Sequence, residues 1–287
     1  MSEVATPTVR RVRRRHVGPT LILGSVLVGL VVLATLVSLV WTPYDPTLVD
    51  SRVPRLLGPS AQHWFGTDAL GRDVFSRILL GSRTTLFVGL VAVGVAAAVG
   101  IPLGLLAAMS PRRWLDEVVM RVGDVMLAFP ALLLAIMFAA VFTRSTQLAM
   151  LAIGIAGIPA FARVARAGAL QVMSLDYVLA ARVAGRSPLA IAVRHVLPNI
   201  ASIVIVQASV SFALAVLAEA GLSYLGLGTP PPTPSWGLML YEGQDFLAQH
   251  PLLVVFPGGA IAIAVLGFNL FGDGLRDLLD PRMEAVR

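Results

Sequence analysis

Long uncharged runs separated by short charged segments are the dominant pattern along this chain. A run of about 18 apolar residues is long enough to cross the hydrocarbon core of a bilayer as a helix. We predict one membrane span in each of six runs. They are Val17–Tyr44 (helix over Leu21–Trp41), Thr84–Pro111, Val125–Thr143, Ser145–Ala162, Asn199–Ala218 and a stretch of Phe246–Gly272 that begins after Pro251. Pro130 and Pro159 should kink or end the helices that contain them.

Composition agrees with an all-α polytopic membrane protein. Hydrophobic residues make up 57% of the chain and charged residues only 13%, about half the charged fraction of a typical soluble domain. All 22 basic residues are Arg, so the Lys of an ATP-binding P-loop is missing. Cys is absent, and the four His are scattered. We therefore predict no catalytic residue, no metal site, no bound cofactor and no enzyme activity for this chain.

The positions of Arg predict the orientation in the membrane. If the N-terminus is cytoplasmic, about sixteen Arg fall in cytoplasmic segments and six in external ones. Because Arg accumulates on the cytoplasmic side, both termini are predicted to be cytoplasmic. The basic N-terminus then faces anionic lipid headgroups and no nucleic acid. The first apolar run is too long for a signal peptide and reads as an uncleaved anchor.

The external segments carry several polar features. From Asp68 onward, apolar residues recur on one helical face, which predicts a short helix on the outer membrane surface in which Asp73 and Arg77 form an ion pair. Glu219 is expected at the membrane edge with access to water. Trp236 and Tyr241 are interpreted as interfacial anchors rather than substrate contacts.

A polar stretch, Asp176–Ile200, interrupts the apolar chain on the predicted cytoplasmic side. Good helix formers precede Gly185, which should end a first helix in a left-handed turn. Ser187 and Pro188 are an N-cap and a first-turn proline, and they should begin a second helix that Pro198 ends. Leu189, Ile191 or Ala192, Val193 and Val196 would give this helix an apolar stripe. The product is a helix–turn–helix elbow, either an amphipathic connector resting on the membrane or a docking surface for another protein.

Four segments resemble ABC importer permeases. Ala180-Ala181, Gly185 and Leu197-Pro198 match the "EAA" loop, although Leu179 replaces its Glu and His195 its usual Ile. HWFGTDALGRDVFSRILLGSRTTLFVG, EAGLSYLGLGTPPPTPSWGLML and NLFGDGLRDLLDPR are similar to signatures of the dipeptide/oligopeptide (and nickel) family, C-type subunit. The resemblance implies six transmembrane helices of the type I importer permease fold, with a cytoplasmic coupling helix between spans 4 and 5.

On this resemblance the chain divides into segments with separate roles. They are the basic N-terminus 1–16, the first span 17–44, an external loop 45–83 with its surface helix, a permease core 84–272 that contains the coupling loop 163–198, and a cytoplasmic tail 273–287. The resemblance implies a related second permease chain, two ATPase subunits that bind ATP and Mg, and an external substrate-binding protein. The function implied is import of short peptides. The alternatives are import of nickel or another small solute and, from a different class, an ATP-independent secondary transporter or channel.

Two groups of residues follow as candidate sites. The group predicted to couple the chain to its ATPase is Ala180, Ala181, Arg182, Gly185, Arg186, Ser187, Leu197 and Pro198. Arg182 and Arg186 stand in for the missing Glu. The group predicted to form the external vestibule or to dock the binding protein is Asp68, Arg72, Asp73, Arg77, Glu219 and Trp236. A capped surface helix is the alternative interpretation of its first four members.

Overall fold

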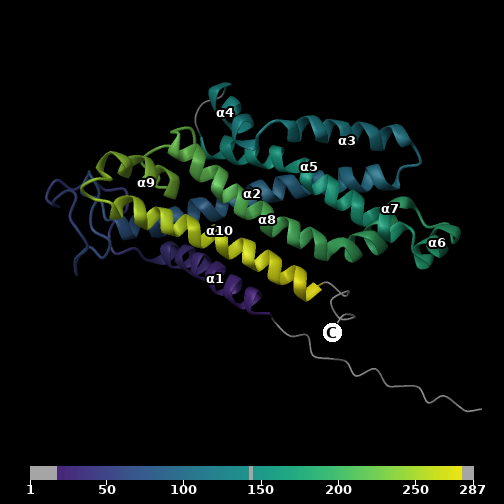
Figure 1. Ribbon diagram of the computed structural model, residues 1–287, viewed down its shortest axis with the longest axis horizontal. Helices are drawn as coiled ribbons and strands as arrows, with labels where there is room; N and C mark the ends of the chain where they lie inside the picture. The colour runs from purple at the N-terminus through teal and green to yellow at the C-terminus, as the bar shows by residue number, and fades with distance from the viewer. Residues whose placement is uncertain (1–17, 142–144, 280–287) are drawn as a thin grey trace, which may run out of the picture.

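The computed structural model describes residues 18–141 and 145–279, which form a bundle of long helices packed side by side (Figure 1). The predicted basic N-terminus, the end of the third apolar run and most of the tail lie outside the described residues. The elements are α1 Pro19–Val40, α2 Val74–Met109, α3 Arg113–Ala128, α4 Ala131–Val141, α5 Thr146–Met173, α6 Asp176–Val183, α7 Pro188–Ile191, the π-helix η1 Ala192–Val196, α8 Leu197–Tyr224, α9 Trp236–Gly243, the 3₁₀ turn η2 Gln244–Phe246 and α10 Leu252–Leu279.

Five helical stretches in the described part are long and apolar enough to span a membrane. They are α1, α2, α5, the continuous stretch Pro188–Tyr224 and α10. The third predicted span is different, because its residues are split between α3 and α4, whose axes are bent by 86°. The break falls at Phe129 and Pro130, as predicted for Pro130. A residue before proline is driven out of the helical region, and Phe129 is extended at φ −89°, ψ 126°.

Two helices extend well beyond the apolar runs that predicted them. α2 has 36 residues and begins ten residues before Thr84. At 1.5 Å per residue it is about 54 Å long, whereas a hydrocarbon core is about 30 Å thick. α5 continues through Pro159 to Met173, so Pro159 does not end this helix; of the two predicted effects of this proline, a kink or an end, the second does not occur. The added stretches, at the start of α2 and at the end of α5, contain Arg, which ended the uncharged runs, but Arg, Leu and Ala are good helix formers and can continue a helix.

The predicted surface helix beginning at Asp68 does not form. Residues 68–73 make a turn, in which Asp68 Oδ1 accepts hydrogen bonds from the backbone N–H groups of Leu70 (2.8 Å) and Arg72 (2.9 Å). Gly71 has φ +81°, a conformation that side chains disfavour. Asp73 then caps α2 by accepting from the N–H of Ser76 at 2.7 Å. The amphipathic residues that follow are the first turns of α2 itself.

Close packing of small residues holds the bundle together. A Cβ on Gly100 would lie 2.5 Å from the carbonyl oxygen of Ile158, and one on Gly104 would lie 2.3 Å from that of Ala162. α2 and α5 therefore approach until their backbones touch, the packing typical of helices in lipid. α1 lies against α10 in the same way, since a Cβ on Gly24 would meet the backbone of Phe271.

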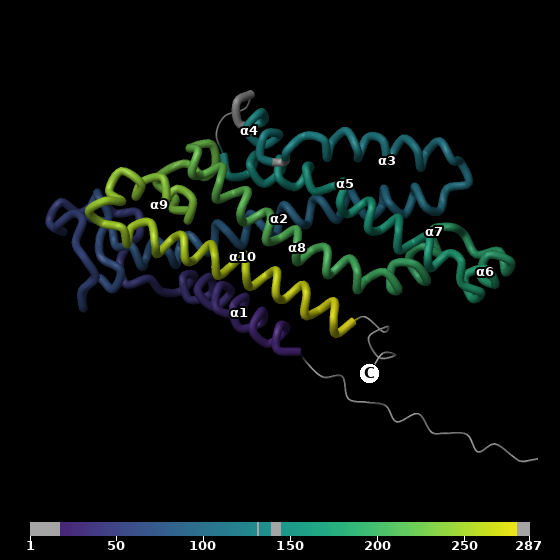
Figure 2. The backbone as a smooth tube through the Cα atoms, viewed as in Figure 1, coloured from purple at the N-terminus to yellow at the C-terminus, as the bar shows by residue number. Residues whose placement is uncertain are grey.

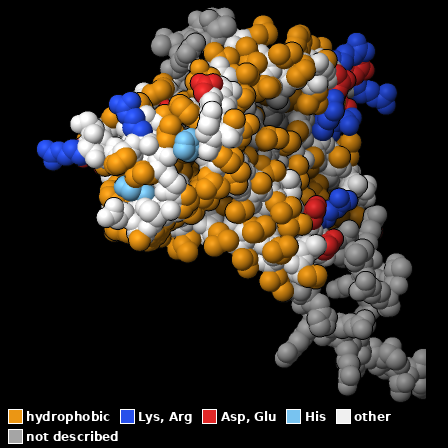
Figure 3. All heavy atoms as spheres, turned by 60° about the vertical axis from the view of Figure 1, so that its left-hand side comes forward, with side chains coloured by type: hydrophobic (Ala, Val, Ile, Leu, Met, Phe, Trp, Pro, Cys, Tyr) orange, Lys and Arg blue, Asp and Glu red, His pale blue; other side chains and the backbone are white. Residues whose placement is uncertain are grey.

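The two ends of the bundle differ from its middle. The loop 41–73 and α9 lie at one end, and α6 and α7 lie at the other (Figures 1 and 2). The start of α1 packs beside Gly274 near the end of α10, and both point toward the end with α6. In the view of Figure 3, hydrophobic side chains cover the middle of the surface and charged ones gather toward the ends. Exposed Leu33, Phe87 and Leu214 belong to this apolar surface, which suits contact with lipid.

Candidate functional site

The predicted elbow is present, and its turn has the predicted geometry. α6 ends at Val183, and Gly185, two residues further on, has a φ of +75°. The N–H of Gly185 donates to the carbonyl of Arg182 (3.1 Å), and the N–H of Arg186 donates to the carbonyl of Ala181 (3.1 Å). This pair of bonds is the Schellman motif, which satisfies the last carbonyls of a helix and requires a left-handed residue. Gly185 therefore fixes the angle at which the chain leaves α6.

The second arm of the elbow begins as predicted but does not end at Pro198. The hydroxyl of Ser187 accepts from the N–H of Ala190 at 3.3 Å, and Pro188 occupies the first turn. The helix then passes through the π-helical segment η1 into α8 without a break. Proline lacks an N–H and its ring clashes with the carbonyl four residues earlier, so a wider π turn just before Pro198 relieves the conflict. The second arm is thus a rigid extension of a membrane span.

A small apolar core anchors the elbow to the bundle. Val178 of α6 and Ile191 and Val196 of the second arm are buried. They join one hydrophobic cluster that also contains Leu105 of α2 and Ala169 of α5. The elbow is therefore packed directly against α2, α5 and α8. The predicted apolar stripe is only half correct, because Leu189 and Val193 face outward.

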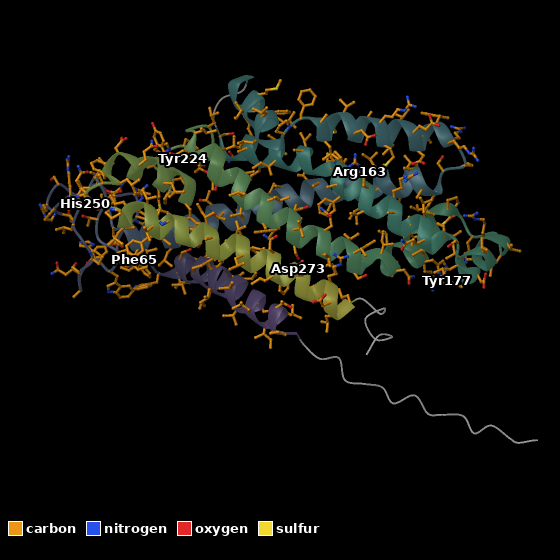
Figure 4. All side chains as sticks on the ribbon, viewed as in Figure 1. Phe65, Arg163, Tyr177, Tyr224, His250 and Asp273 are labelled. Carbon is orange, nitrogen blue, oxygen red and sulfur yellow. The ribbon has the colours of Figure 1, made fainter. Side chains whose placement is uncertain are left out.

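Most predicted coupling residues lie on the exposed side of the elbow. Ala180, Arg182, Gly185, Arg186, Ser187 and Pro198 are exposed, whereas Ala181 and Leu197 are partly buried. Two apolar residues in the same region escaped the prediction: Val183 is 89% exposed and Leu189 is 74% exposed. The signal in the sequence that could have identified them is an apolar residue among charged ones in this segment. Figure 4 shows Tyr177 of α6 at this end and His250 at the opposite end.

At the opposite end, a charged cluster joins the start of α2 to α9. Arg72 contacts Asp68 through Nε (2.7 Å) and Glu242 through Nη2 (2.9 Å). Arg77, only 1% exposed, forms ion pairs with Asp68 and with Glu242, the latter at 2.8 Å. The four side chains help to line a cavity of about 180 Å³ together with Met239. Two cations and two anions therefore balance in a largely buried site.

The expected ion pair between Asp73 and Arg77 is wrong. The carboxylate of Asp73 caps α2 and lies 2.9 Å from Nδ1 of His63, whose ring contacts that of Tyr44 in a tilted arrangement. Arg77 turns to Asp68 and Glu242 instead. Glu242 is 165 residues further along the chain than Arg77, so no local spacing in the sequence could reveal this partner.

Glu219 and Trp236 are both buried, which corrects two expectations. Glu219 Oε1 accepts from the hydroxyls of Ser223 (2.7 Å) and Thr229 (3.4 Å), so this carboxyl does not lie at a wet membrane edge. Trp236 is 2% exposed and donates from Nε1 to the carbonyl of Ile78 at 3.0 Å. It packs over Gly81 of α2 and is no interfacial anchor. Tyr241 remains exposed.

The bundle of long apolar helices defines a polytopic membrane protein, and sequence comparison identifies its family. The chain belongs to the binding-protein-dependent transport system inner membrane components, whose family model matches residues 100–285. It is a multi-pass protein of the bacterial cytoplasmic membrane. Within the family it stands with the C-type permeases of the dipeptide and oligopeptide group.

Individual relatives and a solved structure agree with this placement. The dipeptide transport system permease protein DppC of Alkalihalophilus pseudofirmus is 42% identical over 90% of this chain and 86% of its own length. The glutathione transport system permease protein GsiD of Pectobacterium atrosepticum is 40% identical over 96% of this chain and 90% of its own length. The fold is similar to a chain of the inward-facing MetNI methionine ABC transporter, with a TM-score of 0.58 and 17% identity over 71% of this chain and 96% of that one.

Proposed function

We propose that this chain is one of two transmembrane subunits of an ATP-driven importer of short peptides. The relatives named for dipeptide and glutathione transport support a peptide substrate, since both substrates are short peptides. The second transmembrane subunit is a related permease. Two ATPase subunits on the cytoplasmic side bind ATP and Mg, and an external binding protein delivers the substrate. Nickel or another small solute is the alternative cargo of the same machinery.

The elbow is the observation that carries the proposal. Its tip exposes apolar Val183 and Leu189 next to Arg182 and Arg186. Exposed apolar side chains outside the membrane region mark a surface that another protein covers. Its base is fixed in the apolar core shared by α2, α5 and α8. When the ATPase subunits close on ATP, the elbow moves with them and changes the tilt of these helices.

The orientation follows from the same arrangement. With the elbow in the cytoplasm, the charged cluster around Arg77 and the loop 41–73 lie outside. The first residues of α1 and the last of α10 then point toward the cytoplasm, in agreement with the distribution of Arg. The charged cluster around Arg77 supports the vestibule by fixing α9 against α2. The binding protein docks on exposed residues around this cluster, such as Leu70.

Substitution of Gly185 tests the docking geometry. A β-branched residue at φ +75° is strained by about 1–2 kcal/mol. Gly185→Val should therefore change the angle between the two arms of the elbow and reduce copurification of the ATPase roughly tenfold. Gly185→Asn is the matched control, because Asn tolerates the left-handed region and should retain the ATPase. Pull-down of ATPase with tagged permease measures both. Equal retention by Gly185→Val and wild type would contradict the proposed docking.

A further inference from the structure

A polar groove lies between the end of α1 and the third turn of α2, and it shares no lining residue with the cavity of the charged cluster around Arg77. It has a volume of about 530 Å³ and is open to the surface. Its polar lining includes Ser38, Tyr44, Asp45, Thr47 and Arg83. One cation and one anion therefore line the same groove, and their charged atoms are more than 4.0 Å apart, since they form no ion pair.

The cation of the groove is available to an external anion. Arg83 donates from Nε to the hydroxyl of Ser38 at 2.7 Å, which fixes the guanidinium across the α1–α2 contact. Among residues 18–141 and 145–279, no carboxylate pairs with Arg83 and nothing accepts from its Nη1 and Nη2. Two parallel N–H donors held in this way match the oxygens of a phosphate.

The anion of the groove has one oxygen engaged and one free. Asp45 Oδ1 accepts from the N–H and the hydroxyl of Thr47 (2.9 and 2.7 Å) and from the N–H of Leu48 (3.3 Å). Those hydrogen bonds, the backbone bond from Thr47 foremost, lower the pKa of Asp45 and keep it ionised. In the described part of the chain, Oδ2 accepts from no donor. It therefore offers a fixed negative charge to an ammonium group.

The groove lies at the depth of lipid headgroups. Ser38 is two residues from the end of α1, an apolar helix with most of its surface exposed. Val40 at that end is 91% exposed, and the neighbouring Trp41 and Tyr44 are also exposed. Aromatic residues immediately after a span mark the boundary between acyl chains and water. A ligand of the groove would thus have its apolar part beside α1.

We propose that this groove binds the headgroup of a zwitterionic ethanolamine phospholipid, with the phosphate on Arg83 and the ammonium on Asp45 Oδ2. A purely anionic headgroup would meet the Asp45 carboxylate, and a choline headgroup cannot donate a hydrogen bond to it. The bound lipid would link α1 to α2. The proposal depends on the membrane position of α1 and not on peptide import, so either can fail alone.

The test is the lipid retained by the assembled importer. Complexes are reconstituted in nanodiscs of equal parts ethanolamine, choline and glycerol phospholipids, extracted in mild detergent and weighed by native mass spectrometry. Wild type should retain the ethanolamine lipid roughly three- to tenfold over the other two. Arg83→Gln should lose retention of all three. Asp45→Asn, which keeps the Oδ1 acceptor, should lose only the preference for ethanolamine. Arg55→Gln, at an exposed Arg of the loop 41–73 that also carries Asp45, is the matched control and should behave as wild type.

Four results would overturn the proposal. They are equal retention of the three lipids by wild type, preference for the glycerol lipid, retention unchanged by Arg83→Gln, and displacement of the bound lipid by a soluble dipeptide. The last would make the groove a peptide site. Recovery of each variant in the assembled complex, measured in the same spectra, separates loss of lipid from loss of folding.

Discussion

Replacing Val183 with aspartate should abolish ATP-driven peptide uptake while leaving the permease folded. Val183 is 89% exposed at the end of α6 and belongs to none of the buried hydrophobic clusters, so the fold of this chain does not depend on it. In the proposed complex the ATPase covers this apolar side chain. An unpaired carboxylate placed there costs several kcal/mol, and about 2.8 kcal/mol already corresponds to a 100-fold loss of binding.

The control for Val183→Asp is the same change at Val49. This residue is also exposed and apolar but lies in the loop at the opposite end of the molecule, away from any ATPase contact. Uptake of labelled peptide into proteoliposomes is the measurement. Val183→Leu should retain uptake, because it keeps the surface apolar. If Val183→Asp transported as well as Val49→Asp, the elbow would not be the docking surface.

Replacing Arg77 with methionine should have the largest effect on stability. Removal of its guanidinium leaves Asp68 and Glu242 with Arg72 as their only partner in the ion-pair cluster. Breaking a buried pair in this way costs about 3–5 kcal/mol, because an uncompensated charge stays behind. The loop 66–73 and α9 should separate, exposing Trp236 and the start of α2. Thermal unfolding of the purified permease and proteolysis of the external loop would both record the loss.

The matched control for Arg77→Met is Arg121→Met on α3. Arg121 is exposed and lies 3.9 Å from Glu117, which is also exposed, so the change should alter stability by less than about 0.5 kcal/mol. An Arg77→Met protein as stable as Arg121→Met would show that the cluster does not hold α9 in place.

Local signals in the sequence were enough to predict the elbow. Gly185, Ser187 and Pro188 act on their own backbone and nearest neighbours, and their geometry is as predicted. The prediction that Pro198 ends the second arm was wrong, because the π turn before Pro198 lets the helix continue into α8. Hydropathy likewise located five of the six predicted spans, whereas the third is broken between α3 and α4. It did not locate the start of α2 or the end of α5, since charged residues can continue a helix beyond an apolar run.

Contacts between segments far apart in the chain could not be predicted from the sequence. The partner of Arg77 is Glu242, and the burial of Glu219 depends on Ser223, Thr229 and the packing of α8 against its neighbours. Helical spacing suggested Asp73 as the partner of Arg77, but Asp73 is engaged by the cap of α2 and by His63. Which partner a charged side chain contacts is decided by tertiary packing, and tertiary packing cannot be read from a single sequence.

The most direct test of the central claim is uptake of a radiolabelled dipeptide into proteoliposomes. The vesicles contain this chain, its partner permease and the ATPase subunits, with the binding protein on the side of the external loop. The account predicts accumulation that requires ATP, the binding protein and the ATPase, and that stops with Val183→Asp. Uptake by this chain without ATP or ATPase would contradict it.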